Sequence, residues 1–446
     1  MKLSVVIPAW NEADNLAKLL PQLHAVLSTL ECEYEVIVVD NHSADATAQI
    51  CAAASAVLVQ QTERGYGGAL WAGFARARGE FILTMDADLS HVPDFIPAMW
   101  SHRSDAELVI ASRYTEGGSG DMPWYRYVLS VILNQVYTKI LALPLKDISS
   151  GFRLYHAAAL RGLDLQSNDF DALEEILIKC YARGYRIIEI PFRYVPRDKG
   201  ESKVKLLRFG IAYLKTLIRM WKLRNSVASA DYDARAFDSI IPLQRYWQRR
   251  RYRIVTSMVD ASKPCLDIGC GSSRILGALP EHSVGLDVEQ GKLLYARRYS
   301  RSLVHGSAFA LPFPNKTFEQ VVCSQVIEHL PAGEQPFAEM TRVLRDGGHL
   351  VLGTPDYDRL SWRFFECLYG FFAPGAYADQ HITHYTRDDL IRRMAAYGLH
   401  LKRTEYVLNS EMILLFERND TVRPGQSAAL LAQQAHHDGL PKGKGN

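Results

Sequence analysis

Two acidic residues one position apart, Asp86 and Asp88, are the first candidates for chemistry in this sequence. They end a short apolar segment, residues 81–86, and a helical pattern that opens with Pro93 follows them. Mg²⁺ and Mn²⁺ bind one or two carboxylates together with substrate phosphates, and such an ion can neutralise a nucleotide diphosphate as it leaves. A D-x-D pair is common by chance, so its position at a strand end is what makes it a candidate metal site.

A glycine-rich turn in the second half of the chain is the second candidate. Asp267, Gly269 and Gly271 stand in the sequence CLDIGCGSSRIL, and Asp287 ends the next expected strand. Glycines let the backbone approach a ligand closely, and a carboxylate at that strand end can accept both hydroxyls of a ribose. The turn alone fits a nicotinamide site equally well, so it predicts a nucleoside-containing cofactor without naming it.

The elements that must position these residues alternate between short β-branched segments and helical patterns, in two separate stretches. This alternation predicts α/β units with mostly parallel sheets, which bind ligands outside the carboxyl ends of their strands. We therefore predict two Rossmann-like α/β domains. The expected strands are residues 3–7, 34–40, 57–60, 81–86 and 108–112 in the first, and 265–267, 283–287, 303–306, 320–323 and 349–354 in the second.

The chain is expected to divide into four parts. These are a first domain over residues 1–203, a basic amphipathic helix and linker over 204–263, a second domain over 264–420 and a flexible tail over 421–446. The tail lacks large aromatic residues and ends in Gly and Lys, a composition typical of disordered segments.

Composition argues against several classes of protein. With 51 basic and 49 acidic residues among 446, the chain lacks the basic excess of a nucleic-acid binder. It has no apolar run of about eighteen residues, so no spanning helix is expected, and residues 1–10 predict a strand instead of a signal peptide. Seven cysteines without a CxxC pair fit neither a disulfide framework nor a zinc knuckle. We therefore expect a cytoplasmic protein with buried thiols.

The connector contains a helix with a basic stripe and a wide apolar face. At helical spacing the cations Arg208, Lys215, Arg219 and Lys222 form one stripe, and Leu207, Ile211, Leu214, Ile218 and Trp221 form another. Such a helix can lie in a membrane interface; the alternative is a helix packed on the first domain with its cations in water. A later run of cations, residues 248–253, is expected to be a solvated helix face.

Residues 3–203 resemble a family 2 glycosyltransferase of the polyprenyl (dolichyl) phosphate mannosyltransferase type. The resemblance rests on six segments in the family's order: VVIPAWNEADNL, EVIVVDNHSADAT, RGYGGALWAGFARARGEFILTMDADLSH, ELVIASRYTEGG, DISSGFRLY and YRIIEIPFRYVPRDKGESK. It implies a GT-A fold and an inverting, metal-dependent transfer of a sugar to polyprenyl phosphate. GDP-mannose is the expected donor, and Mg²⁺ or Mn²⁺ is the expected cofactor.

The resemblance also implies a nucleotide-sugar site. Its residues are Pro8, Trp10, Glu12, Asp40, Asp86 and Ala87, with Arg197 and Lys203 closing over the phosphates, and Asp88 with Asp86 holding the catalytic metal. Trp10 replaces the usual Tyr beside the base, and both rings can stack. Asn41 and His42 replace a more usual Asp-Asn or Asp-Gly, so the identity of the base is left open.

A phosphate acceptor needs cations more than a base, because its second pKa is about 6 and it is largely a dianion at neutral pH. Arg113 and Arg126 flank a glycine-rich stretch, residues 115–121, and Arg can bond two phosphate oxygens at once. A helix-surface cation is the alternative for Arg126. Glu175 matches an acidic position of the family and could act as base if the acceptor were a hydroxyl. Asp147 is expected either to cap a turn or to touch substrate.

Residues 264–417 resemble class I S-adenosylmethionine-dependent methyltransferases. The resemblance rests on CLDIGCGSSRIL, GSAFALPFPNKTFEQVVCSQVIEHL and RVLRDGGHLVLGTPD. It implies that Asp267, Gly269 and Gly271 surround the methionine part of the cofactor and that Asp287 holds the ribose. The whole cofactor site so implied comprises Asp267, Gly269, Gly271, Asp287, Ser307 and Gln325.

Two positions depart from the methyltransferase pattern, and several residues are candidates for the methyl acceptor. Ser273 stands where a third Gly is frequent, and Ser307 stands where an Asp beside the adenine is common. Glu328 and His329 could act as base or as metal ligands, with a helix-start hydrogen bond as the alternative for His329. Two further acceptor-site candidates in DQHITHYTRDDL are His381 and His384.

Together these patterns predict a bifunctional enzyme at the cytoplasmic face of a membrane. The first domain transfers a sugar to polyprenyl phosphate, and the second methylates a glycan, lipid or related small molecule. One alternative keeps the sugar transfer but uses a glycan hydroxyl as acceptor. Another makes the second domain a degenerate binding module. No nucleic-acid partner is expected.

Overall fold

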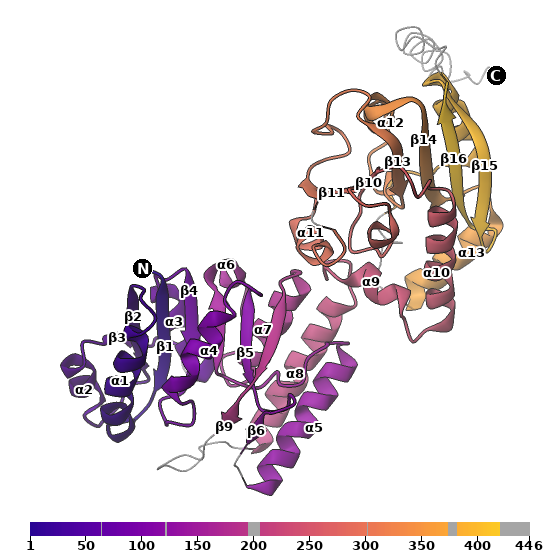
Figure 1. Cartoon of the computed structure of the whole chain (residues 1–446). Coiled ribbons are helices and arrows are strands. Elements are labelled where there is room, and N and C mark those ends of the chain that lie inside the picture. The colour runs from indigo at the N-terminus through magenta and orange to yellow at the C-terminus, as the bar shows by residue number, and fades with distance from the viewer. Residues whose placement is uncertain (64, 121–122, 195–205, 301, 373–380, 420–446) are drawn as a thin grey trace, which may run out of the picture. The chain divides into compact units, whose positions relative to one another are not determined.

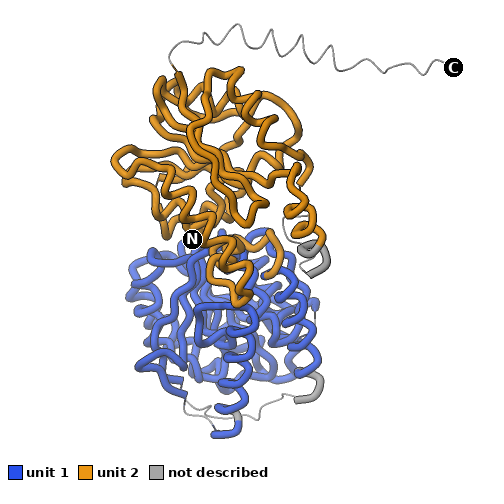
Figure 2. Tube along the Cα trace, turned by 90° about the vertical axis from the view of Figure 1, so that its right-hand side faces the viewer, with its two compact units in different colours: residues 1–224 blue, residues 225–446 orange. Residues whose placement is uncertain are grey.

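The computed structural model describes residues 1–63, 65–120, 123–194, 206–300, 302–372 and 381–419. The chain forms two compact units, residues 1–224 and 225–446 (Figure 2). The basic helix expected in a separate connector belongs to the first unit, and the helices after it belong to the second. The tail over residues 421–446 lies outside the described residues.

The first unit is built on a seven-stranded sheet with the order β3-β2-β1-β4-β7-β5-β8 (Figure 1). The strands β3, β2, β1 and β4 are parallel, β7 runs antiparallel to both of its neighbours, and β8 is parallel to β5. Their bounds are β1 Leu3–Ala9, β2 Tyr34–Asp40, β3 Val57–Gln60, β4 Phe81–Thr84, β5 Leu108–Ser112, β7 Arg153–His156 and β8 Ile187–Pro191. Two short strands, β6 Ser119–Gly120 and β9 Arg193–Tyr194, form a separate ladder.

Helices cover both faces of this sheet because the inner strands are apolar on both sides. Val5 packs in one core with the leucines of α1, whereas its neighbour Val6 packs in another core with Ala69 of α3, as the alternation of side chains along a strand requires. Gly73 of α3 has no room for a side chain, since a Cβ there would lie 2.3 Å from Val6. The helices are α1 Ala13–Ser28, α2 Thr47–Ala53, α3 Tyr66–Arg76, α4 Ile96–Ser101, α5 Trp124–Ile140, α6 Ala157–Leu160, α7 Ala172–Ala182 and α8 Leu206–Arg224.

The second unit has a seven-stranded sheet with the order β12-β11-β10-β13-β14-β16-β15. The strands from β12 to β14 are parallel, and β16 is antiparallel to β14 and β15. The strands are β10 Cys265–Ile268, β11 Val284–Asp287, β12 Leu303–His305, β13 Phe318–Ser324, β14 Leu344–Pro355, β15 Leu399–Val407 and β16 Glu411–Arg418. The helices are α9 Tyr232–Phe237, α10 Pro242–Ser257, α11 Gln290–Ala296, α12 Gln335–Val343, α13 Leu360–Phe372 and α14 Arg387–Ala396, with a short 3₁₀ turn at Ile327–His329.

All ten strands expected from the sequence are present, and the predicted fold class of two α/β domains with mostly parallel sheets is confirmed. The expectation of buried thiols also holds for most of the cysteines. All seven are free, five are buried, Cys32 is half-buried and Cys367 is exposed.

One part of the sequence prediction was wrong in the second unit. Arg251, expected on a solvated face, donates from Nε and Nη2 to the two oxygens of Glu411, at 2.6 Å each, and Trp247 also donates to this carboxylate. Glu411 is 1% exposed, and a buried carboxylate needs a partner. The mostly apolar sequence of β16 did not indicate that its first residue, Glu411, would be buried and paired with Arg251.

No helix in the described part of the chain is both long enough and apolar enough to cross a bilayer.

Candidate functional sites

Parallel strands bring the predicted nucleotide-sugar residues to one edge of the first sheet. Asp40 ends β2 in register with Ala9 of β1, and Pro8 pairs with Val39 one step earlier. The Asp40 carboxylate is 2% exposed and accepts from Gln60 Nε2 at 2.9 Å and from the Ser43 backbone N–H at 3.1 Å. This carboxylate therefore joins the end of β3 to the loop after β2, and backbone pairing joins β2 to β1.

The loops after β1 and β2 are bonded to each other. The Asn11 N–H donates to Ser43 Oγ at 2.7 Å, and Asn11 Oδ1 accepts from the Ala44 N–H at 2.8 Å. Asn11 and His42 adopt left-handed backbone angles, with φ of 54° and 53°, a conformation in which Asn and His are enriched. The sequence interpretation missed the structural role of Asn11, and its residue type directly after a strand was the available signal.

Two further predicted residues lie in the same loops. The Glu12 N–H donates to Thr47 Oγ1 at 3.2 Å, and Glu12 Oε2 accepts from Asn15 at 2.6 Å. Trp10 has 45% of its surface exposed at the strand end. The structure therefore places Pro8, Trp10, Glu12 and Asp40 on neighbouring strand ends, as the sequence pattern requires.

Asp86 and Asp88 follow β4, which pairs in parallel with β1. Asp86 Oδ1 accepts from the Tyr66 hydroxyl at 3.0 Å, and the Asp86 N–H donates to His91 Nδ1 at 2.9 Å. Burial, together with Asp86, raises the pKa of Tyr66 well above its usual value, so the hydroxyl stays a donor. Tyr66 and His91 were not among the predicted residues, and neither has a spacing in the sequence that would connect it with Asp86.

The Asp88 carboxylate is more deeply placed than that of Asp86. It is 7% exposed and accepts from the Ser90 N–H at 3.1 Å, across a turn in which Leu89 has a φ of 65°. Ala87 between the two acids is also buried. Two carboxylates in one turn suit a divalent ion that completes its shell with substrate phosphates.

Arg113 is held by a buried ion pair. Its Nε and Nη2 donate to the two oxygens of Asp147 at 2.8 and 2.7 Å, and Nη2 also donates to Ser149 Oγ at 2.8 Å. Burial alone would raise the pKa of Asp147, but the Arg113 guanidinium holds that pKa below its usual value. Asp147 therefore acts through Arg113, a pairing that the sequence interpretation did not contain.

The structure does not describe the side chains of three predicted cations. Arg197 and Lys203 fall in the segment 195–205, and Arg126 lies on α5 with a side chain that the structure does not describe.

Adjacent glutamates on α7 have opposite surroundings. Glu175 accepts from the Ser167 N–H at 2.7 Å and pairs with Lys179 at 2.6 Å and Arg219 at 3.6 Å. Burial opposes ionisation, but these bonds hold the pKa of Glu175 below its usual value. These contacts keep Glu175 ionised, as a base requires. They also bond its carboxylate to the loop that contains Ser167 and to Arg219 of α8. Its role as base stays a prediction.

Glu174 is buried in the core of the first unit. Among the described residues neither of its oxygens has a hydrogen-bond partner. Burial raises the pKa of Glu174 to about 8, against the attraction of Arg153. This carboxyl is therefore mostly protonated at neutral pH.

Two neighbouring helices of the first unit expose an apolar surface, which we call the α5–α8 apolar face. The helices α5 and α8 lie beside each other (Figure 1), and the Tyr137 and Tyr213 rings are in contact between them. The centroids of these rings are 6.3 Å apart. Of the 24 large apolar side chains exposed in the described part of the chain, twelve belong to this face. They are Trp124, Tyr125, Tyr127, Val128, Leu129, Ile132, Val136 and Ile140 of α5, and Ile211, Leu214, Ile218 and Trp221 of α8.

Some of the cations predicted beside this face are exposed to water, and one is hydrogen-bonded to protein groups. Lys215 and Lys222 are exposed, whereas Arg219 donates to Gln166 Oε1 and Ser167 Oγ at 2.7 Å each. The side chain of Arg208 lies outside the described ones. The helix α8 therefore packs on its own unit along one side and exposes the other. Binding of the exposed side to a membrane interface stays a prediction.

The glycine-rich turn of the second unit borders a cavity of about 410 Å³. Gly269 and Gly271 have φ of 67° and 52°, and a Cβ on Gly269 would lie 2.3 Å from Val326. Asp287 accepts from the N–H groups of Gly271 and Glu289, at 2.8 Å each. The predicted residues that line the cavity are Asp267, Gly269, Gly271, Ser273, Asp287, Ser307, Gln325, His329 and His381.

The polar groups of this cavity fit a cofactor that carries a nucleoside and a charged amino-acid part. Asp267 Oδ2 is buried and has no hydrogen-bond partner among the described residues, so this oxygen can bond to a ligand in the cavity that Asp267 lines. Burial and the nearby Asp287 raise the pKa of Asp267 to about 8. Ser307 and Ser273 point their hydroxyls at nearby backbone, accepting from the Phe309 and Ile275 N–H groups at 3.2 Å each.

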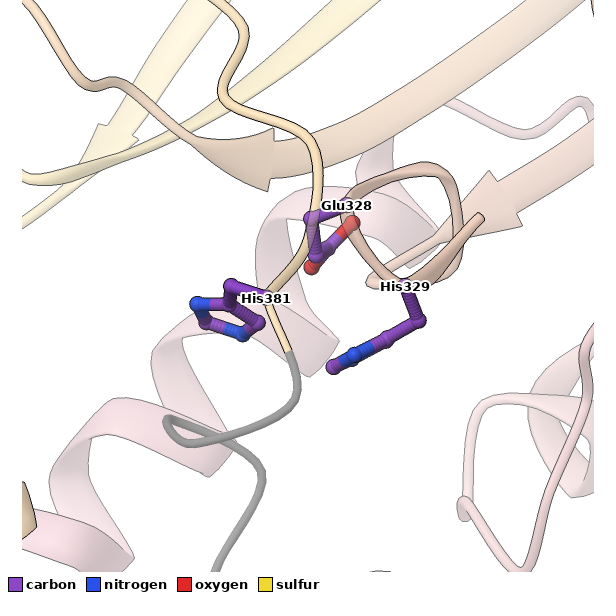
Figure 3. Close-up of side chains that lie close together, drawn as sticks. All are labelled: Glu328, His329 and His381. Carbon is purple, nitrogen blue, oxygen red and sulfur yellow. The ribbon is translucent and has the colours of Figure 1, made fainter. Parts of the chain in front are cut away.

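Glu328, His329 and His381 come together (Figure 3), and the two histidines line the same cavity. One potential ligand atom from each lies within 4.8 Å of the others. Burial raises the pKa of Glu328 to about 8 and lowers that of His381. His384 stacks on Tyr357, with ring centroids 4.0 Å apart, and is not part of this cluster.

Comparisons with known proteins agree with both predicted resemblances. A family model described as "Glycosyl transferase family 2" matches residues 4–163, and one described as "Methyltransferase domain" matches residues 266–352. Dolichol-phosphate mannosyltransferase of Pyrococcus furiosus is 33% identical over 238 residues, which are 51% of this chain and 66% of the relative. Undecaprenyl-phosphate mannosyltransferase of Micrococcus luteus is 34% identical over 218 residues, which are 46% of this chain and 88% of the relative.

A third relative acts on a different sugar. Undecaprenyl-phosphate 4-deoxy-4-formamido-L-arabinose transferase of Edwardsiella ictaluri is 30% identical over 212 residues, which are 46% of this chain and 63% of the relative. The chain thus spans just under two thirds of the Pyrococcus and Edwardsiella proteins. Among solved structures, glucosyl-3-phosphoglycerate synthase of Mycobacterium tuberculosis is similar with a TM-score of 0.40 and 20% identity, over 49% of this chain and 79% of that one.

The Micrococcus relative is matched over most of its length, and the two family models fall on the two units in the predicted order. The chain therefore belongs to glycosyltransferase family 2 and carries a methyltransferase domain after its glycosyltransferase domain.

Proposed function

We propose that the first domain transfers a sugar, with inversion, from a nucleotide donor to polyprenyl phosphate, and that GDP-mannose is the donor. The observation that carries this proposal is the placement of Asp40, Asp86 and Asp88 on neighbouring parallel strand ends. The names of the relatives support the acceptor more strongly than the sugar, because they share a polyprenyl phosphate and differ in what they transfer.

Different residues at the carboxyl ends of these strands would bind different parts of the donor. Asp86 and Asp88 would bind Mg²⁺ or Mn²⁺, which supplies positive charge against the leaving nucleoside diphosphate. Glu12 and Asp40 present carboxylates for the nucleoside, and the exposed ring of Trp10 can stack on its base. Arg197 and Lys203 would then close over the phosphates.

The acceptor would be positioned by cations. A polyprenyl phosphate carries its own nucleophilic oxygen as a dianion, so the protein has to orient it instead of deprotonating it. Arg113 is fixed in one orientation by Asp147, which accepts from its Nε and Nη2. Its Nη1 would be the nitrogen that donates to the phosphate. Arg126 would provide a second contact from the start of α5.

The α5–α8 apolar face is the proposed route to a membrane-bound acceptor. Large exposed apolar surfaces mark interaction sites, and interfacial helices combine such a face with flanking Lys and aromatic residues. Trp124 and Trp221 lie on the face, and Lys215 and Lys222 lie exposed on α8. The protein would then bind peripherally to a membrane surface, on its cytoplasmic side, next to a lipid-linked phosphate.

The test of sugar transfer is an incubation of the full chain with radiolabelled GDP-mannose, Mg²⁺ or Mn²⁺ and polyprenyl phosphate, followed by organic extraction. Label is expected in the organic phase, and Asp88→Asn should reduce it by about 100-fold because a metal ligand is lost. Label that appears only in water-soluble saccharide would favour a glycan hydroxyl acceptor instead. Label only from UDP-sugars would keep the transfer and replace the donor.

We further propose that the second domain binds S-adenosylmethionine and transfers its methyl group. Asp287 would accept the ribose hydroxyls, Asp267 would face the methionine part, and the bare backbone at Gly269 and Gly271 would admit the cofactor. The bound cofactor supplies an electrophilic methyl group on a positively charged sulfur. The acceptor would enter on the side of His329 and His381, which line the same cavity.

Titration calorimetry with S-adenosylhomocysteine tests this second activity. One equivalent is expected to bind, and Asp287→Ala should weaken binding by at least about tenfold because two ribose hydrogen bonds are lost. Absence of binding to the unsubstituted chain would favour the degenerate binding module.

A further inference from the structure

Glu328, His329 and His381 form a compact donor set from two distant parts of the chain. Glu328 and His329 lie in the 3₁₀ turn after β13, and His381 lies in the segment before α14. Their potential ligand atoms all lie within 4.8 Å of one another (Figure 3). In the described residues this is the single group of three or more His, Cys, Asp or Glu side chains with that geometry.

The backbone holds the two parts of the cluster against each other. The N–H groups of Ile382 and Thr383 donate to the Glu328 carbonyl at 2.9 and 3.1 Å, and Thr383 Oγ1 donates to the Leu330 carbonyl at 2.6 Å. The residue after His381 is thus bonded to the residue that carries the carboxylate. The two bonds to the Glu328 carbonyl join backbone groups, so they do not depend on side-chain rotamers.

Outer hydrogen bonds orient the ligands. His381 Nδ1 lies 3.0 Å from the Tyr357 hydroxyl and 3.5 Å from Glu366 Oε1, so Nε2 is the nitrogen available on the opposite side of the ring. Glu328 Oε2 accepts from Thr354 Oγ1 at 3.1 Å. Metal-binding histidines commonly have their second nitrogen bonded to a carboxylate or a similar group in this way.

We propose that Glu328, His329 and His381 bind a divalent transition-metal ion, of the Zn²⁺ or Mn²⁺ type, at the wall of the cofactor cavity. Two imidazoles and one carboxylate suit such an ion better than Mg²⁺ or Ca²⁺, which prefer oxygen ligands. Three protein ligands leave at least one coordination position open, as in catalytic metal sites. His329 and His381 both line the cavity, so an ion that they hold would be accessible from it.

The chemistry of such an ion defines a class of methyl acceptor, an inference that rests on the proposed methyl transfer. A hydroxyl oxygen bound to the ion loses its proton to water more readily. Its lone pair then forms the bond to the methyl carbon while the carbon–sulfur bond breaks and its electron pair returns to sulfur. The products are a methyl ether, a thioether and a proton, so the site predicts an acceptor with a hydroxyl group.

The test is the stoichiometry of Zn²⁺ binding to the chelator-stripped full chain, measured by calorimetry. Other residues can also bind ions, namely Asp86 and Asp88 and the two consecutive histidines His436 and His437. The quantity compared is therefore the number of equivalents of Zn²⁺ that each variant binds. His329→Asn and His381→Asn should each bind one equivalent fewer than the unsubstituted chain. The matched control His384→Asn, three positions away and outside the cluster, should lose none.

A second variant covers the case in which removing a ligand prevents folding. Glu366→Gln keeps all three ligands and alters the outer contacts of His381, namely Glu366 itself and the Tyr357 hydroxyl that donates to it. It should weaken this one site by about tenfold. Equal stoichiometry and affinity in the unsubstituted chain and all the cluster variants would overturn the metal site. Binding of S-adenosylhomocysteine is measured on the same samples, so failure of the metal site and failure of the cofactor site remain distinguishable.

Discussion

At the scale of single residues, Glu174 and Glu175 show how surroundings decide what a carboxylate does. They are neighbours on one helix, and both side chains are fully buried. Glu175 is paired with Lys179 and Arg219 and bonded by backbone N–H groups, whereas Glu174 has no hydrogen-bond partner among the described residues. Glu175 is therefore stabilised as an anion and Glu174 as a neutral acid.

Replacing Glu174 by Gln is expected to stabilise the protein at alkaline pH. The pKa of Glu174 is raised to about 8 in the folded state, above its value near 4.3 in an unfolded chain. Its favourable contribution is therefore complete below the unfolded pKa and is lost as pH rises through about 8. Thermal unfolding of Glu174→Gln should match the unsubstituted chain at pH 5 and exceed it by about 5 °C at pH 9.

The matched control is Glu175→Gln, for which the sign is opposite. The folded pKa of Glu175 is lowered, so its contribution is present above the unfolded pKa and is lost as pH falls through the folded value. This variant should melt below the unsubstituted chain at pH 7 to 9, with a difference that shrinks toward pH 4. The same pH dependence in both variants would contradict the contrast between the two carboxyls.

At the scale of elements, the positions of the strands could be predicted from the sequence. Which face of each helix is buried could be predicted only in part. Runs such as Val36 to Val39 are apolar without alternation, which is typical of strands buried on both faces, and Asp40 then marks the strand end. By contrast, α5 has apolar residues around most of its circumference. Its sequence could not show that Tyr137 would turn inward while Ile132 and Val136 stay exposed, because that depends on its contact with α8.

The α5–α8 apolar face makes a prediction about membrane binding. Replacing Leu214, Ile218 and Trp221 of α8 by Ser or Gln should shift the protein from floating vesicles to the supernatant. Each large side chain withdrawn from the interface removes about 1.5–3 kcal/mol of burial, so three changes suffice to reduce binding strongly. Flotation with vesicles that contain anionic phospholipid measures the effect.

Two further variants make the flotation experiment specific. Leu129, Ile132 and Val136 of α5, replaced in the same way, should reduce binding as the α8 changes do, because they belong to the same face. Ile240, Ile241 and Leu408 are exposed apolar residues of the second unit, and their replacement should leave flotation unchanged. If neither helix variant moves into the supernatant, the face does not bind membranes.

At the scale of the whole molecule, the place where the chain divides depends on long-range contacts. The composition of residues 204–263 indicated a connector, but α8 is bound to the first unit through Thr216 with Asp171 at 2.7 Å and Arg219 with Glu175. Farther along the chain, α10 supplies Trp247 and Arg251 to Glu411 in the second unit. Such pairings join residues far apart in sequence, and no local pattern reveals them.

The candidate sites also combine residues that the sequence pattern identifies with residues that only long-range contacts bring together. Asp86, Asp88, Asp287 and the glycines were visible in the sequence because each occupies a strand end with a short spacing. His381 was connected with Glu328 only by the fold, through the hydrogen bonds from Ile382 and Thr383. Tyr66 beside Asp86 and Asp147 beside Arg113 were likewise hidden, since 20 and 34 positions separate the partners.

Each site is composed of residues from one unit, which predicts that the two activities are separable. The carboxylates of the donor site fall within residues 1–224, and every residue that lines the cofactor cavity falls within 225–446. Asp88→Asn should therefore lose sugar transfer and retain its affinity for S-adenosylhomocysteine, while Asp287→Ala should show the reverse. Both assays are carried out on the same two full-length variants, so each serves as the folding control of the other. Loss of both activities in Asp287→Ala, with an unchanged unfolding midpoint, would instead show that sugar transfer depends on the methyltransferase domain.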